Sequence, residues 1–89
     1  MATVHLPRLL DPTTRGRRTL QVAGSDVETA IASLVEALPG VEGHLFDHSG
    51  ALRPHVLCFV DGEATRLENR SAAVSERTEI RFVQAVSGG

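Results

Sequence analysis

Residues 78–89, TEIRFVQAVSGG, carry an alternating strand pattern directly into two terminal glycines. Ile80 and Phe82 are two positions apart, so in a strand both side chains point to the same face of a sheet. We expect this strand to hold them against the core. Gly88 and Gly89 have no side chains to pack, and chain ends are poorly ordered unless they are tied down. The stretch therefore predicts a structured strand followed by a short flexible tail.

A second apolar strand is predicted in residues 54–60. Alternate side chains of a strand point to opposite faces, and here both faces are apolar. One face carries Val56, Cys58 and Val60. The other carries Leu57 and Phe59, which are either buried as well or left exposed. Grouped exposed apolar residues commonly mark interfaces, so Leu57 and Phe59 are the candidate residues for binding a partner.

A helix is predicted over residues 25–38. Its apolar side chains recur at intervals of three and four residues, which gives one apolar stripe along a helix. The stripe consists of Val27, Ile31, Leu34, Val35 and Leu38. Ser25 followed by Glu28 has the spacing of a capping box, in which two side chains satisfy backbone amides of the first turn. Pro39-Gly40 is expected to end the helix.

Two further strands are predicted before this helix, in residues 3–10 and 17–23, joined by a loop rich in turn formers. Residues 41–52 have a weak pattern, which predicts a short helical turn followed by a loop. The predicted order is strand, strand, helix, strand, a minor strand and a last strand. A single long helix that covers one sheet face implies a two-layer α+β domain.

Length and composition exclude several classes of function. Eighty-nine residues fit one domain, which we expect to span residues 1–86, with the tail at residues 87–89. The net charge of −2 gives no general attraction to nucleic acid or to an anionic membrane. The longest apolar run, residues 56–60, is too short to span a bilayer. Cys58 is the single cysteine, so no internal disulfide can form, and the cytoplasm is the expected compartment.

The chain offers little for catalysis of its own. Cys58 lies in mid-strand among apolar neighbours, where cysteine is more often inert core than a nucleophile. His44 and His48 have the spacing of a metal-binding pair on a helix, but no cysteine or third histidine near them completes a site. We therefore predict no catalytic residue, no metal and no bound cofactor. All nine basic residues are arginine, so the chain contains no lysine.

The whole chain resembles the ThiS/MoaD family of sulfur carriers, the prokaryotic relatives of ubiquitin. The resemblance rests on LRPHVLCFVDGE, residues 52–63, where an apolar strand ends in Asp-Gly-Glu, and on the tail AVSGG, residues 85–89. It implies a ubiquitin-like β-grasp fold, with one main helix on one face of a mixed four- to five-stranded sheet. The connection at residues 41–52 looks closer to CysO-type carriers of cysteine synthesis than to the small subunits of molybdopterin synthase. The sequence departs from the family pattern at Gln84, where proline is common, and at residues 75–77, which lack the usual Asp-Gly-Asp turn.

The resemblance also implies a chemical role for the tail. A partner enzyme of the ubiquitin-activating type uses ATP to adenylate the Gly89 carboxylate, and a sulfur donor then converts the adenylate to a thiocarboxylate. Val86, Ser87 and Gly88 thread the tail into the partner's active site, where glycine allows the closest approach of the backbone. The accepting partner is expected to be a biosynthetic enzyme such as a cysteine synthase-like sulfhydrylase.

Three alternatives stay open at this point. The first is the small subunit of molybdopterin synthase, in which the tail chemistry is the same and only the partner differs. The second is a protein modifier that is conjugated to lysines of its targets. The third is a β-grasp binding module whose tail is idle.

Overall fold

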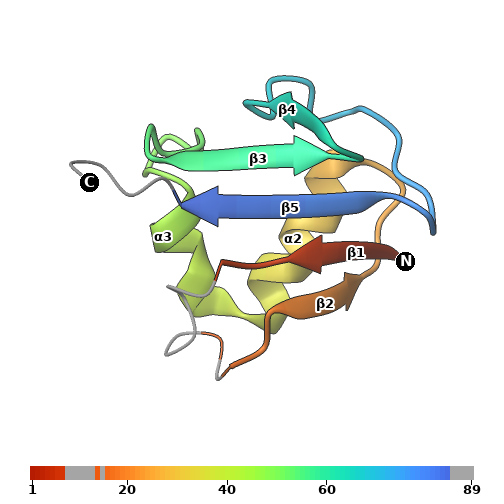
Figure 1. Ribbon diagram of the computed structural model, residues 1–89, viewed down its shortest axis with the longest axis horizontal. Coiled ribbons are helices and arrows are strands. Elements are labelled where there is room, and N and C mark those ends of the chain that lie inside the picture. The colour runs from red at the N-terminus through yellow and green to blue at the C-terminus, as the bar shows by residue number, and fades with distance from the viewer. Residues whose placement is uncertain (8–13, 15, 85–89) are drawn as a thin grey trace.

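The computed structural model describes residues 1–7, 14 and 16–84 (Figure 1). In chain order, its elements are β1 (Ala2–His5), β2 (Thr19–Val22), α2 (Val27–Ala37), the 3-10 turn η2 (Pro39–Val41), α3 (Glu42–Leu45), β3 (Val56–Val60), β4 (Glu63–Thr65) and β5 (Glu79–Gln84). The predicted boundary between domain and tail, at residue 86, lies outside the described residues. None of the described helices is long and apolar enough to cross a membrane.

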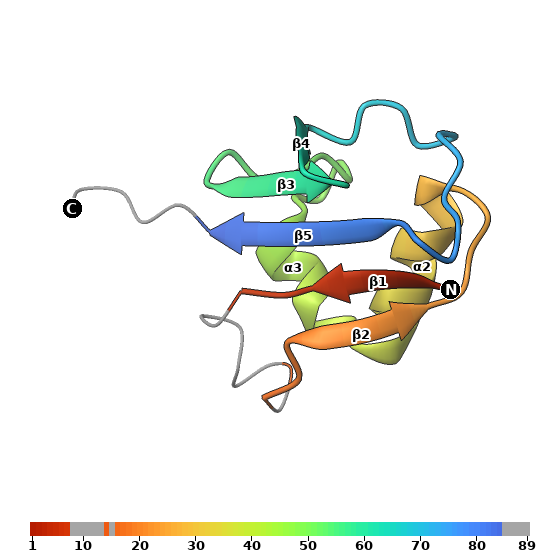
Figure 2. The same cartoon turned by 45° about the vertical axis from the view of Figure 1, so that its right-hand side comes forward.

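The described strands form one mixed sheet of five strands in the order β2-β1-β5-β3-β4. β1 and β5 run parallel, and the other neighbouring pairs run antiparallel. The helices α2 and α3 lie behind the sheet in Figure 1, and the turned view of Figure 2 keeps them on that same side. The structure thus confirms a two-layer α+β domain with one main helix on one sheet face.

The alternation of β3 and β5 decides which side chains reach the core. Ile80 is fully buried and Phe82 is 2% exposed, as the spacing of the last strand predicts. Cys58 of β3 lies directly opposite Phe82, and it is also 2% exposed. Leu34 of α2 is fully buried between the two layers. One sheet face and one helix stripe therefore make a single core.

The helix cap differs from the prediction by one residue. Asp26, rather than Ser25, is the N-cap of α2, and its Oδ1 accepts a hydrogen bond of 2.9 Å from the backbone amide of Thr29. In return, the backbone amide of Asp26 donates to the Thr29 hydroxyl at 3.3 Å. The capping box is therefore present, but with Asp26 and Thr29 in the places predicted for Ser25 and Glu28. These bonds lower the pKa of Asp26, the backbone amide of Thr29 contributing most.

The connections between elements follow local chemistry. Asp61 and Gly62 form the two-residue turn between β3 and β4, with φ values of 50° and 85°. Asp-Gly is favoured in such turns because both positions need a positive φ. The first strand is shorter than predicted, since β1 ends at His5, before Pro7. Proline cannot donate to a ladder hydrogen bond, which is consistent with an end at that point.

Candidate functional site

The sheet face opposite the helices carries an exposed apolar cluster. Leu57 on β3 is 42% exposed, and Val83, its cross-strand neighbour on β5, is 36% exposed. Phe59 lies two residues along β3 on the same face and is half-buried. We call Leu57, Phe59 and Val83 the open-face patch. The helices cover the face that carries Val56 and Cys58, so of the two arrangements left open by the sequence, the exposed one is correct.

Sequence analysis missed Val83, although the signal was present. Ile80 and Phe82 were assigned to the inner face, and a period of two then places Val83 on the outer face. What the sequence could not supply was the register. That register sets Val83 opposite Leu57, and so makes one cluster from residues of two strands far apart in the chain.

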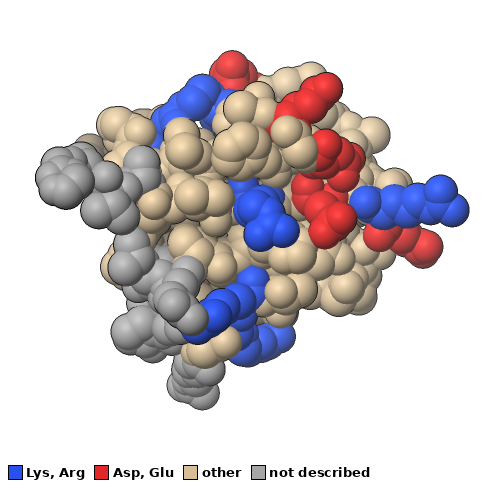
Figure 3. Space-filling model, viewed as in Figure 1, with Lys and Arg blue, Asp and Glu red and all other residues tan. Residues whose placement is uncertain are grey.

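The carboxylates of the open face lie toward one end of the sheet. Nε2 of His5 lies 2.7 Å from Oε1 of Glu79, at the start of β5. Arg81 is the next outward residue on β5, and the register sets it between His5 and Phe59. In Figure 3 the carboxylates gather toward the end of the face where β5 begins. Leu57 and Val83 lie toward the other end, at which β5 finishes.

The open-face patch lies next to the point where the chain leaves the sheet. Val83 is followed by Gln84, the last residue of β5, and residues 85–89 come directly after it. The structure brings Leu57 and Phe59 together as candidate interface residues. The predicted tail residues Val86, Ser87, Gly88 and Gly89 lie outside the described residues.

Cys58 is only 2% exposed, which leaves almost no surface from which it could act as a nucleophile. Burial raises the pKa of the Cys58 thiol to about 12, and the positive charges of Arg66 and Arg70 offset only part of that rise. The reactive form of cysteine is the thiolate, so a thiol with this pKa is inert near neutral pH. Cys58 is therefore a core residue, as its sequence context predicted.

The two histidines with metal-like spacing are not arranged as a pair. α3 ends at Leu45, so His44 lies on the helix and His48 lies in the loop after it. Across residues 1–7, 14 and 16–84, no three side chains of His, Cys, Asp or Glu are grouped so that they could hold a metal ion.

Comparison with known proteins points to one kind of protein. No family model matches the chain. The sulfur carrier protein CysO of Mycobacterium tuberculosis is 29% identical over 90 residues, which cover 98% of this chain and 97% of that protein. CysO of Mycobacterium bovis matches to the same extent.

Solved structures agree with the sequence comparison. The crystal structure of Mycobacterium tuberculosis CysO has a TM-score of 0.82 and 26% identity, and the match covers 97% of this chain and 100% of that one. These comparisons support a ubiquitin-like sulfur carrier similar to CysO. A chain of the Amycolatopsis orientalis BexX/CysO complex, 23% identical and matched over the full length of both chains, has the same fold, with a TM-score of 0.84. The sheet order and the single covered face of this sulfur carrier are thus those of a β-grasp domain, as the family resemblance implied.

Proposed function

We propose that this sulfur carrier holds sulfur as a thiocarboxylate on Gly89 and donates it in the biosynthesis of cysteine or another sulfur metabolite. The Gly89 carboxylate attacks the α-phosphate of ATP on an activating enzyme of the ubiquitin-activating type, and pyrophosphate leaves. Sulfide then attacks the acyl carbon, AMP leaves, and the thiocarboxylate remains on Gly89. The observation that carries the proposal is the match to CysO sulfur carriers across 98% of this chain and 97% of theirs.

In this proposal the chain is a protein co-substrate rather than an enzyme. ATP and the catalytic groups belong to the activating partner, and the sulfur acceptor is a sulfhydrylase of the cysteine synthase type. The reaction would take place in the cytoplasm. The structure of CysO in complex with BexX supports the idea that carriers of this kind work through protein partners.

The geometry of the open face supports a role for the open-face patch in activation. Residues 85–89 span at most roughly 17 Å when fully extended. A partner active site that receives Gly89 must therefore lie within that distance of the end of β5, and the patch is the apolar surface at that end. Exposed apolar clusters of this kind commonly mark protein interfaces.

The first test of this function is direct detection of the thiocarboxylate. We expect incubation with the cognate activating enzyme, ATP and sulfide to replace one C-terminal oxygen by sulfur, which intact-mass spectrometry resolves. A reaction without ATP is the control and should leave the mass unchanged. No mass gain from an enzyme that is active in ATP–pyrophosphate exchange with this chain would contradict the carrier function.

Replacing Leu57 by aspartate is expected to weaken binding of the activating enzyme at least tenfold while the domain stays folded. A buried charge at an apolar interface is costly, whereas a side chain that is 42% exposed can be changed with little effect on the core. The matched control is Thr19→Asp, which places the same charge at an exposed position of β2, outside the patch. Titration calorimetry and thermal melting measure the two effects. Equal losses of binding in both variants would show that charge alone, rather than the patch, is responsible.

A modifier function is the second candidate, because modifiers are also among the structural neighbours. SAMP1 from Haloferax volcanii is 28% identical with a TM-score of 0.75, and another structure names it as small archaeal modifier protein 1. Isopeptide adducts on target lysines would support this function. Since the chain has no lysine, such adducts could not extend into chains linked through its own lysine side chains.

The remaining alternative, the small subunit of molybdopterin synthase, differs from the proposed function only in its partner. Copurification with a molybdopterin synthase large subunit, rather than with a sulfhydrylase, would reassign the carrier to molybdopterin synthesis.

A further inference from the structure

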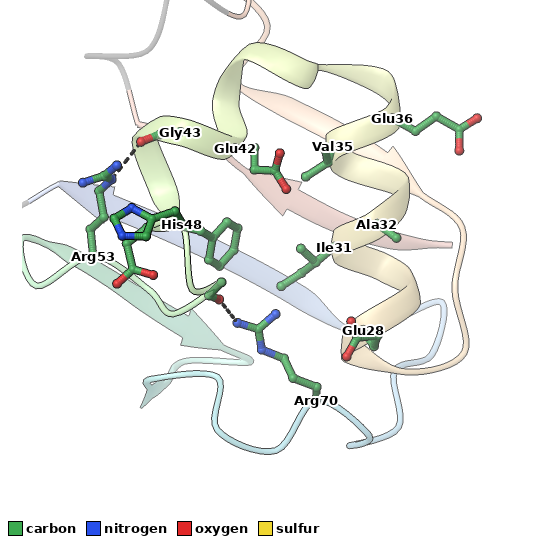
Figure 4. Close-up of a pocket in the computed structure, with 13 residues that line it drawn as sticks. Glu28, Ile31, Ala32, Val35, Glu36, Glu42, Gly43, His48, Arg53 and Arg70 are labelled. Atoms are coloured by element: carbon green, nitrogen blue, oxygen red, sulfur yellow. Dashed lines mark hydrogen bonds between the residues drawn. The ribbon is translucent and has the colours of Figure 1, made fainter.

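A groove runs between α2 and α3 in the helical layer, on the side of the sheet away from the open-face patch (Figure 4). Its volume is about 740 Å³. Ile31 and Val35 of α2 and Phe46, directly after α3, supply the apolar part of its lining. Pockets that take a ligand or a few side chains of a partner have volumes of roughly 300–1,000 Å³. The groove is therefore large enough to receive a short peptide segment.

Three glutamates stand around this apolar surface. Glu28 and Glu36 belong to α2, and in Figure 4 the Glu36 carboxylate extends outward at the rim of the groove. Glu42 belongs to α3 on the facing wall and points toward Val35. All three are exposed. Within the part of the chain that the structure describes, no ion pair or side-chain hydrogen bond engages any of them. Their negative charge is thus available to a partner.

Among the described residues, the two arginines of the groove form no ion pair with these glutamates. Nε of Arg53 donates to the carbonyl of Gly43 at 2.8 Å, and the Arg70 guanidinium donates to the carbonyl of Gly50 at 2.7 Å (Figure 4). Arg70 also lies over the ring of Phe46, 5.4 Å from its centroid. Both arginines are therefore engaged by neutral groups, but they keep their positive charge. With Asp47, which also lines the groove, four carboxylates face two guanidinium groups, so the lining is net negative.

We propose that this groove docks a partner protein through a short segment that presents an apolar side chain flanked by arginine or lysine. The apolar side chain would cover Ile31 and Val35, and the flanking cations would meet the glutamates on the two walls. A neutral or acidic segment would leave the carboxylates unpaired beside it, which costs free energy when water is removed.

This surface would give the carrier two independent binding faces. The open-face patch belongs to the sheet and the groove belongs to the helical layer, so a partner bound in the groove leaves the patch accessible (Figure 2). The idea of two partners rests on the proposed function, because a carrier must meet both an activating and an accepting protein. The docking chemistry itself rests only on the groove.

A synthetic peptide of alternating leucine and arginine residues tests the groove. We expect amide shift changes in the ¹⁵N-labelled full chain to concentrate at Ile31, Val35 and Gly43, and binding to weaken several-fold as salt screens the charges. The double variant Glu36→Gln/Glu42→Gln should weaken binding by roughly threefold to tenfold, as expected for two exposed ion pairs. A peptide with glutamate in place of arginine should not bind.

The matched control is Glu63→Gln/Glu76→Gln, which removes two exposed glutamates outside the groove. Shifts spread over the open-face patch, binding of the glutamate peptide, or an equal loss in both double variants would each overturn the proposal. Thiocarboxylate formation by Glu36→Gln/Glu42→Gln is measured separately and should equal that of the wild type. Peptide binding therefore tests the groove and thiocarboxylate formation tests the carrier function, so a negative result for one is distinguished from a negative result for the other.

Discussion

Deletion of Gly89 is expected to abolish thiocarboxylate formation and to leave the midpoint of thermal unfolding unchanged within error. The deletion moves the terminal carboxylate back by one residue, about 3.3–3.6 Å of reach. A misplacement of about 1 Å in an active site can already cost a factor of roughly 100 in rate. Stability should be spared, because Gly89 has no side chain and lies beyond Gln84, where β5 ends. Thermal melting and intact-mass spectrometry on the same samples measure both effects.

Two further variants show what the activating enzyme requires. Deletion of Ser87 shortens the tail equally but keeps both glycines, so activity in that variant alone would assign the defect to the missing glycine rather than to reach. One alanine added after Gly89 should also block the reaction until a protease removes it. Adenylation of the uncleaved extended form would show that the Gly89 carboxylate is not the reacting group.

The fold was largely predictable because periodicity is a local property. The three- and four-residue spacing of apolar side chains predicted α2, and alternation at Ile80 and Phe82 predicted the inner face of β5. Strand pairing joins β1 to β5 across most of the chain, and no local pattern encodes that contact. The resemblance to a known family implied a mixed sheet, but it did not specify this pairing.

Local sequence patterns could not predict which face of β3 packs against the helix. Leu57 and Phe59 are as apolar as Val56 and Cys58, so hydrophobicity alone could not say which pair meets the helix. Packing of α2 against the sheet decides it, and Leu57 is left 42% exposed. A strand that is apolar on both faces within a sheet covered on one side is itself a sign of an interface.

Sequence patterns also could not predict the groove. Its walls come from α2, α3 and the loop that carries Arg70, three segments that are separate in the chain. Arg70 is held by the backbone carbonyls of Leu67 and Gly50 and by the ring of Phe46, and the contacts with Gly50 and Phe46 join segments that are distant in the chain. The predicted position of the helix cap was wrong for a different reason. Serine and aspartate both cap helices well, so adjacent Ser25 and Asp26 offered two starts one residue apart.

Phe82 is first by volume among the fully buried side chains of the described residues. It is 2% exposed on the inner face of β5, and its ring meets that of Phe46 edge to face, with the centroids 6.2 Å apart and the planes at 85°. This geometry is favourable for aromatic pairs beyond the area that they bury. Phe82 therefore joins the sheet to the segment that follows α3.

Phe82→Ala is expected to lower the free energy of unfolding by about 3–5 kcal/mol, because it removes a buried ring and leaves a cavity. Domains of this size are typically stable by only about 5–15 kcal/mol, so the variant should be close to unfolding. Phe59→Ala makes the same chemical change on the open face, where the ring is half-buried, and should cost less than half as much. Denaturant titration of both variants measures the difference. Equal losses would mean that the open face is as well packed as the core, and would contradict its role as a free docking surface.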